Sequence, residues 1–182
     1  MKFTPQSIPD VVVVEPRVFG DHRGFFMETW HRGRFADAGI TAQFVQDNHS
    51  RSARHTLRGL HYQYRRPQGK LVRVVSGAVA DVAVDLRRSS PTFGRHVVAR
   101  LDAERHEQLW IPPGFAHGFL VLSESAELVY KCTELYDPSD EHTIRWDDPD
   151  LAIAWPLPPG VTPVLSDKDA AGAAFRVADC FP

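Results

Sequence analysis

Short apolar segments separated by turn residues form the dominant pattern along the chain. Each segment is rich in β-branched and aromatic side chains and is bounded by Gly, Pro or Asp, as β-strands are. Strands are predicted at 11–14, 24–30, 44–49, 57–64, 70–76, 79–86, 96–101, 108–111, 118–122, 127–135 and 143–146. A helical period is nearly absent, and short helices are predicted only at 32–38 and 168–175, the second capped by Ser166 or Asp167. The pattern therefore predicts an all-β protein, a jelly-roll β-barrel with a few short helices.

The length of 182 residues suits a single domain with a sizeable core. The sequence contains no internal repeat. The Pro-rich stretch 156–160 has the composition of a linker, but the residues after it are too few to form a second domain. We therefore predict one domain over 1–182, with a tail from about 151 to 182 that wraps around the barrel.

Composition and charge exclude several classes of partner. The 21 basic and 23 acidic side chains leave no basic excess for binding nucleic acid. No apolar run approaches the ~18 residues of a membrane helix, and the first residues lack the apolar stretch of a signal peptide. Cys132 and Cys180 have no zinc-type spacing, so two free thiols in a reducing compartment are expected. These features predict a cytoplasmic protein that binds neither membrane nor nucleic acid.

The predicted strand 79–86 alternates in an informative way. Asp81 and Asp85 share one face, opposite Val82 and Val84. This polar face is either a solvated outer surface or part of a ligand cavity inside the barrel. The pattern alone leaves both interpretations open.

A second group of polar residues resembles the metal site of a cupin barrel with its ligands replaced. In that frame two histidines one residue apart precede a glutamate, but here His61 is followed by Gln63, and Lys70 takes the place of the glutamate. The segment 112–117 matches the Pro-x-Gly-x-x-His turn of the second half of such barrels, and ends at His117. Because a protonated lysine repels a cation and cannot coordinate it, we predict a cupin frame without a metal.

Without a metal, these side chains suit proton transfer beside a carbonyl. A lysine ammonium stabilises an oxyanion, and a neutral imidazole removes a proton. Together Lys70 and His61 fit the enolisation of a carbon next to a ketone. His61 requires an acceptor that fixes its tautomer, and the acidic motif 166–169 offers candidates.

Three further segments carry possible ligand contacts. The polar run 45–50 is unusual for a strand and offers hydrogen bonds to a polar ligand, while 20–28 combines Arg23 with aromatic rings that suit a phosphate and a base. On the strand 127–132, Tyr130 shares a face with Leu128 and Cys132, where a core tyrosine is the more common finding.

Taken together, the chain resembles the dTDP-4-dehydrorhamnose 3,5-epimerase family over about residues 3 to 175. The matching segments occur in the same order and several are long, which makes the resemblance specific. They are 18–26, 44–50, 57–63, 69–73, 81–87, 109–119, 144–149 and 165–169.

This resemblance implies a cupin-type homodimer without a cofactor. It implies that the enzyme inverts C3 and C5 of dTDP-4-dehydro-6-deoxy-D-glucose through enolates and forms dTDP-4-dehydro-L-rhamnose. The implied catalytic residues are His61 as base, Tyr130 as acid, Asp167 as the partner of His61 and Lys70 beside the enolate. The implied substrate-binding residues are Arg23, Phe25, Glu28, Gln46, Asn48, Arg58, Lys70, His117, Glu141 and Lys168. The family exchanges N-terminal strands, so Arg23 and Glu28 are expected to serve the neighbouring subunit.

Three rival interpretations and one geometric question remain. A metal-dependent cupin enzyme is disfavoured by Gln63 and Lys70, and a non-catalytic sugar-binding module needs no acid–base pair. The nearest rival is a 3-only epimerase or keto-sugar isomerase of deoxysugar biosynthesis. Arg58 and His61 have opposite strand parity, so both reach one pocket only if the backbone bulges near Gly59 or the strand starts there.

Overall fold

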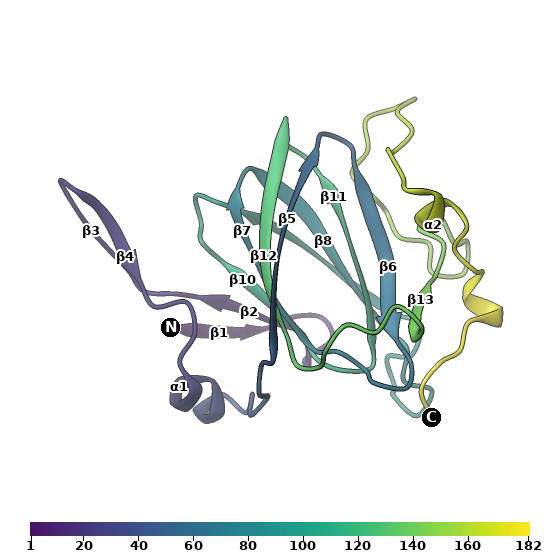
Figure 1. Cartoon of the computed structure of the whole chain (residues 1–182), viewed down its shortest axis with the longest axis horizontal. Helices are drawn as coiled ribbons and strands as arrows, with labels where there is room; N and C mark the ends of the chain where they lie inside the picture. The colour runs from purple at the N-terminus through teal and green to yellow at the C-terminus, as the bar shows by residue number, and fades with distance from the viewer.

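A computed structural model describes all residues from Met1 to Pro182, and two antiparallel β-sheets that face each other form its body (Figure 1). The six-stranded sheet has the order β1 (Lys2–Pro5), β2 (Val12–Glu15), β10 (Gln108–Ile111), β7 (Lys70–Ser76), β12 (Ser125–Cys132) and β5 (Gln46–Ala53). The five-stranded sheet has the order β13 (Glu141–Thr143), β6 (Leu57–Gln63), β11 (Phe115–Val121), β8 (Ala78–Asp85) and β9 (His96–Asp102). The all-β class and jelly-roll arrangement predicted from the sequence are confirmed, with the barrel built as two packed sheets.

Strand β8 explains how the sheets and the tail share the core. Val79 and Ala83 point into the space between the sheets, where they join the largest hydrophobic cluster. Val82 and Val84 point outward and are buried under the C-terminal tail with Leu151. The tail runs along the outside of the five-stranded sheet and joins it through isolated bridges, such as those from Val164 to Thr56 and from Phe181 to Arg87.

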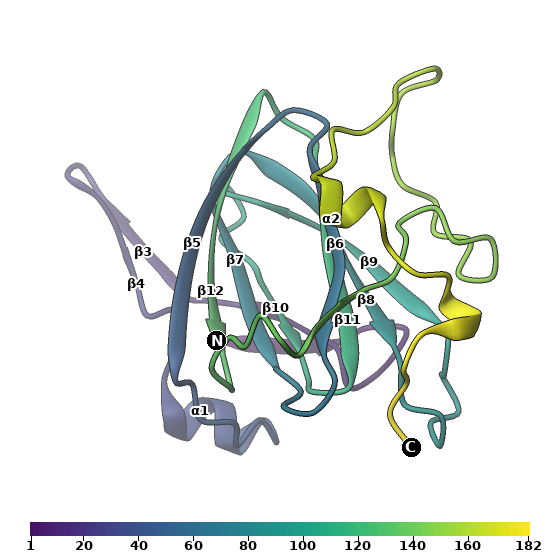
Figure 2. The ribbon, with the colours of Figure 1, turned by 45° about the vertical axis from the view of Figure 1, so that its right-hand side comes forward.

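The remaining elements are a hairpin and short helices. The hairpin of β3 (Val18–Asp21) and β4 (Gly24–Met27) extends away from the sheets (Figures 1 and 2). The helices are α1 (Arg32–Asp37), α2 (Asp167–Ala170) and the 3-10 helix η1 (Phe175–Val177). No helix in the structure is both long enough and apolar enough to cross a membrane.

Two strands were not predicted, and several boundaries differ, most clearly those of the predicted strand 143–146, which lies at Glu141–Thr143, and of the second helix. Strands β1 and β3 were not predicted, because Pro5 in the first and Gly20 and Asp21 in the second are typical of turns. Helix α2 ends at Ala170, well before the predicted boundary, because the chain becomes extended and Ala173 pairs with Ile144.

The predicted irregularity beside Gly59 is confirmed. His61 pairs with His117 and Arg58 with Phe119, so β6 contains one extra residue relative to β11. Gly59 has a φ of 117°, and a Cβ at this position would lie 2.5 Å from the Gly118 Cα. A glycine is therefore required here, and the extra residue allows both Arg58 and His61 to reach the same cavity.

Candidate active site

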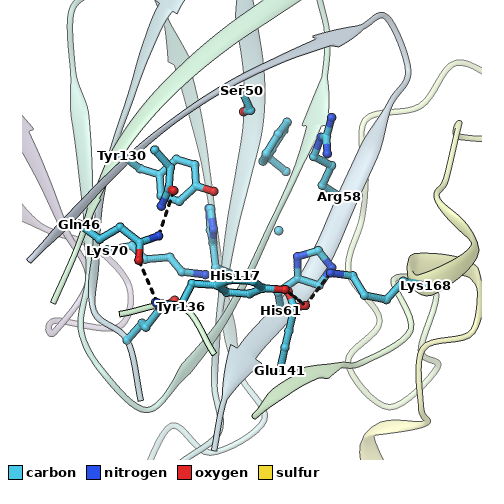
Figure 3. A pocket seen from close by; sticks show the side chains of 14 residues that line it. Gln46, Ser50, Arg58, His61, Lys70, His117, Tyr130, Tyr136, Glu141 and Lys168 are labelled. Carbon is cyan, nitrogen blue, oxygen red and sulfur yellow. Dashed lines mark hydrogen bonds and ion pairs between the residues drawn. The ribbon is translucent and has the colours of Figure 1, made fainter. Parts of the chain in front are cut away.

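A polar cavity lies between the two sheets, on the side where β5 and β6 are adjacent (Figure 3). It brings together nine of the residues predicted from the sequence. They are Gln46, Asn48, Arg58, His61, Lys70, His117, Tyr130, Glu141 and Lys168. Among the other lining residues, Ser50 belongs to the polar run 45–50, and the sequence interpretation missed Gln68, Gly118, Phe119 and Tyr136.

The two sheets contribute different chemistry to this cavity. His61 and His117 come from β6 and β11 of the five-stranded sheet, and they are direct neighbours across these strands. Lys70 and Tyr130 come from β7 and β12 of the six-stranded sheet. Because the sheets face each other, the His61 imidazole and the Tyr130 phenol enter the cavity from opposite sheets (Figure 3).

His61 is held by a buried carboxylate of helix α2. Its Nε2 atom lies 2.6 Å from Oδ1 of Asp169, a residue with only 3% of its surface exposed. Burial would raise the pKa of Asp169, but hydrogen bonds from His61, Ser166 and the Gly59 amide lower it to about 2. Burial lowers the pKa of His61, and Asp169 opposes part of that change. The arrangement gives a neutral imidazole oriented by a carboxylate, which is suited to act as a base.

The prediction that Asp167 is the partner of His61 is therefore wrong. Asp167 is the first residue of α2 and is exposed to solvent. Ser166 caps the helix by accepting a hydrogen bond from the Asp169 amide, and its hydroxyl donates to Oδ2 of Asp169 at 2.6 Å. A Ser with an acidic residue three positions later is a capping pattern, in which the second side chain folds back toward the helix start. That spacing was the signal in the sequence for choosing Asp169.

Lys70 offers an unpaired cation to the cavity. Its ammonium has no hydrogen bond and no ion pair within the chain, whereas Lys168 is paired with Glu141 at 2.8 Å. Burial lowers the pKa of Lys70, and Cys132, Glu141 and Asp81 oppose this. The free ammonium is positioned to contact a ligand atom that carries negative charge.

Gln63, at the position of a second metal ligand in cupin barrels, points away from the cavity. Its Nε2 donates to the carbonyl oxygens of Arg66 and Leu135, and its Oε1 accepts from the amide of Asp137. Gln63 thus fixes the loop that follows β12. A lysine and a structural glutamine occupy the two positions where a metal-binding relative would supply ligands.

Tyr130 has the properties of a proton donor. The side chain is partly buried, and this burial raises the pKa of its hydroxyl. A phenol with a raised pKa keeps its proton at neutral pH. It is then able to protonate a carbon on the side of the ligand opposite His61.

Hydrogen bonds connect the segments around the cavity entrance. The Glu141 carboxylate accepts from the hydroxyl of Tyr136 and from Lys168, both at 2.8 Å. The Tyr136 amide donates to Oε1 of Gln46 at 2.9 Å. Strands β5 and β13, helix α2 and the loop after β12 therefore hold the entrance together.

Three predicted binding residues do not reach the cavity of their own chain. Arg23 lies on the hairpin and is paired with Asp21 at 2.6 Å, and Phe25 beside it is 60% exposed. Glu28 pairs with Arg34 of α1 at 2.9 Å. That Arg23 and Glu28 contribute to the site of a neighbouring subunit stays a prediction.

Comparison with known proteins identifies the relationship. Residues 5–176 match the family described as dTDP-4-dehydrorhamnose 3,5-epimerase. The enzyme of that name from Pseudomonas aeruginosa is 60% identical over 183 residues, which covers 100% of both chains. The chain belongs to this family. It is accordingly an isomerase of the epimerase class.

Solved structures of epimerases agree with this assignment. The dTDP-6-deoxy-D-glucose-3,5-epimerase of Legionella pneumophila, in complex with dTDP-4-keto-L-rhamnose, superposes with a TM-score of 0.93 at 50% identity. The similarity covers 98% of this chain and 94% of that structure. A 3′-monoepimerase of Streptomyces bikiniensis, in complex with dTDP-quinovose, gives a TM-score of 0.88 at 38% identity. It covers 95% of this chain and 87% of the monoepimerase. A 3,5-epimerase and a 3′-monoepimerase thus share this backbone fold.

Proposed function

We propose that the cavity inverts C3 and C5 of dTDP-4-dehydro-6-deoxy-D-glucose and so forms dTDP-4-dehydro-L-rhamnose in dTDP-L-rhamnose biosynthesis. The observation that carries the proposal is the placement of an oriented base, His61, and a protonated phenol, Tyr130, on opposite sheets. Inversion requires one group on each side of the sugar ring, and Lys70 lies in the same cavity without a partner. The bound ligand of the Legionella relative supports a dTDP-sugar as substrate.

The reaction proceeds by two proton transfers at each carbon. His61 removes the proton from the carbon beside the 4-keto group, and the electron pair moves to the keto oxygen to give an enolate. The Lys70 ammonium stabilises that oxygen as its charge develops. Tyr130 then gives its proton to the other face of the carbon, and exchange with solvent restores both side chains. No step requires an oxidant, a cofactor or a metal.

A 3-only epimerase is the second candidate function. The close superposition of the Streptomyces monoepimerase keeps this candidate open, because the backbone does not distinguish one inversion from two. The identity of 60% to a 3,5-epimerase, against 38% to the monoepimerase, favours the double inversion.

Product analysis in deuterated water tests the proposed function. The chain is incubated with dTDP-4-dehydro-6-deoxy-D-glucose, and the product is examined by NMR for deuterium and configuration at C3 and C5. We expect deuterium at both carbons with inversion at both. Label and inversion confined to C3 would identify a 3-only epimerase, and absence of label would exclude an enolising enzyme. Activity retained after chelation by EDTA would agree with a reaction that uses no metal.

A homodimer with exchanged N-terminal segments is the proposed assembly. The hairpin exposes four large apolar side chains, Val18, Phe19, Phe25 and Phe26, and the last is 70% exposed. Arg73 lies on the outer face of the six-stranded sheet, and its buried Nε atom has no hydrogen-bond partner. A second subunit would cover both features. In that arrangement Arg23 and Glu28 would contact the sugar nucleotide bound by the partner.

Mixed dimers test this assembly. We expect subunit exchange between an Arg23→Ala chain and a His61→Ala chain to restore activity, because each mixed dimer then contains one intact site. Random mixing would restore about a quarter of the wild-type sites. The matched control mixes His61→Ala with Lys70→Met, two changes within the same chain's cavity, and should restore nothing. If verified mixed dimers of the first pair stay inactive, each site is built from one chain.

We also propose that the chain acts as one domain in the cytoplasm. Cys132 and Cys180 are both free thiols, which favours a reducing compartment. The tail from 151 to 182 pairs with the five-stranded sheet and contributes Asp169 to the cavity, which supports a single cooperative unit.

A further inference from the structure

A second histidine–carboxylate pair lies beside the proposed base. His117 lines the cavity, and its Nε2 atom lies 2.9 and 3.0 Å from the two oxygens of Asp81. Asp81 is 0% exposed and shares the inner face of β8 with Val79 and Ala83, so the polar face noted in the sequence belongs to the cavity side. The proposed mechanism assigns no role to Asp81.

The Asp81 contact determines how His117 faces the ligand. A carboxylate only accepts hydrogen bonds, so Nε2 of His117 carries the hydrogen. Nδ1 makes no hydrogen bond within the chain. A neutral imidazole held in this way presents Nδ1 as an acceptor, which is available to a bound hydroxyl or to an ammonium.

Asp81 also has fewer partners than the other two carboxylates around the cavity. The Glu141 carboxylate is paired with the Lys168 ammonium, and Asp169 receives hydrogen bonds from His61, Ser166 and Gly59. Asp81 has no hydrogen-bond partner besides His117. Burial of a carboxylate costs folding free energy, and a nearby cation offsets part of that cost.

Lys70 is the cation without a partner. Its side chain extends toward His117 in the cavity (Figure 3), and burial lowers its pKa, with Asp81 among the groups that oppose this. Loss of the proton would remove the charge that stabilises the enolate. The titratable and charged groups around Lys70 are Cys132 and Tyr130 of β12, His61 of β6, His117 of β11, Asp81 of β8, Glu141 of β13 and Lys168 of α2.

We propose that Asp81 is a positioning residue of the epimerase, which orients His117 and supplies the fixed negative charge that keeps Lys70 an ammonium. This inference rests on the proposed function for its role in turnover. The coupling between Asp81 and Lys70, however, is a property of the free protein and is measured without substrate.

Lysine NMR tests the coupling directly. The chain's only lysines are Lys2, Lys70, Lys131 and Lys168, so carbon-13 labelling at lysine Cε gives few signals, and Lys70→Met identifies the one of interest. We expect Asp81→Asn, which keeps the shape and removes the charge, to move the Lys70 titration to lower pH. The matched control is Asp85→Asn on the same face of β8, where the carboxylate is also buried but is paired with Arg87. It should leave the Lys70 titration unchanged.

Kinetics test the consequence for turnover. In Asp81→Asn we expect kcat to fall on the order of tenfold with little change in KM, and the alkaline limb of the pH–rate profile to move to lower pH. An unchanged Lys70 titration would overturn the proposal and leave Asp81 a structural residue. If Asp81→Asn does not fold, Asp81→Ala removes the same negative charge, and we expect it to move the Lys70 titration to lower pH in the same way. Failure of the proposed function would instead appear as wild-type protein that exchanges no substrate protons.

Discussion

Replacement of His61 by alanine is expected to reduce turnover by about 10²- to 10⁴-fold, the usual contribution of a general base. His61 is the only imidazole in the cavity that is oriented by Asp169. The fold should survive, because Asp169 keeps its hydrogen bonds from Ser166 and from the Gly59 amide. Steady-state kinetics with the natural substrate, together with a circular dichroism melting curve, measure both effects.

The two acidic residues of α2 supply matched controls for the His61 result. Asp169→Asn removes the charge that supports the imidazolium, so kcat should fall less than in His61→Ala. Because Asp169 raises the pKa of His61, its loss should move the acid limb of the pH–rate profile to lower pH. Asp167→Asn alters an exposed side chain and should change neither quantity. A His61→Ala enzyme with more than about a tenth of the wild-type rate would remove His61 from the base role.

Replacement of Tyr130 by phenylalanine should separate proton exchange from inversion. His61 would still remove the proton, exchange it with solvent and return deuterium to the face from which the proton came. The mutant should therefore label C3 and C5 in deuterated water but retain their configuration. Inversion should fall on the order of 10²-fold or more, because the opposite face has lost its donor. NMR of the recovered sugar nucleotide reports label and configuration in the same sample.

Tyr62→Phe is the matched control for Tyr130→Phe. Tyr62 lies on β6 but belongs to the hydrophobic cluster under the tail, outside the cavity. Loss of the Tyr62 hydroxyl should change neither proton exchange nor inversion at C3 and C5. Unimpaired inversion by Tyr130→Phe would show that another group, or water, delivers the second proton.

The family resemblance named most of the cavity residues, and the strand pattern explains the direction of some of them. Alternation places Lys70 on the same strand face as Val72, and Tyr130 on the same face as Leu128; the structure shows that both faces point inward. The irregular register at Gly59 was also predictable, because Arg58 and His61 have opposite parity along one strand. Local periodicity is a reliable guide wherever a side chain's direction is set by its own strand.

Features set by tertiary contacts were less predictable. The motif 166–169 contains two acidic residues, and only the turn of α2 decides that Asp169 faces His61 while Asp167 faces solvent. For Asp81 the sequence allowed both an outer face and a cavity, since the alternation in β8 does not say which face is covered by the tail. Tyr136 was missed because it lies in a loop, where no period indicates direction.

The separation of His61 and Asp169 by 108 positions has a consequence for synthesis of the enzyme. Every strand of both sheets, and every cavity-lining residue except Lys168, precedes α2 in the chain and is synthesised before it. The base remains without its orienting carboxylate until the late segment docks beside β6. Maturation of the catalytic centre therefore coincides with completion of the polypeptide.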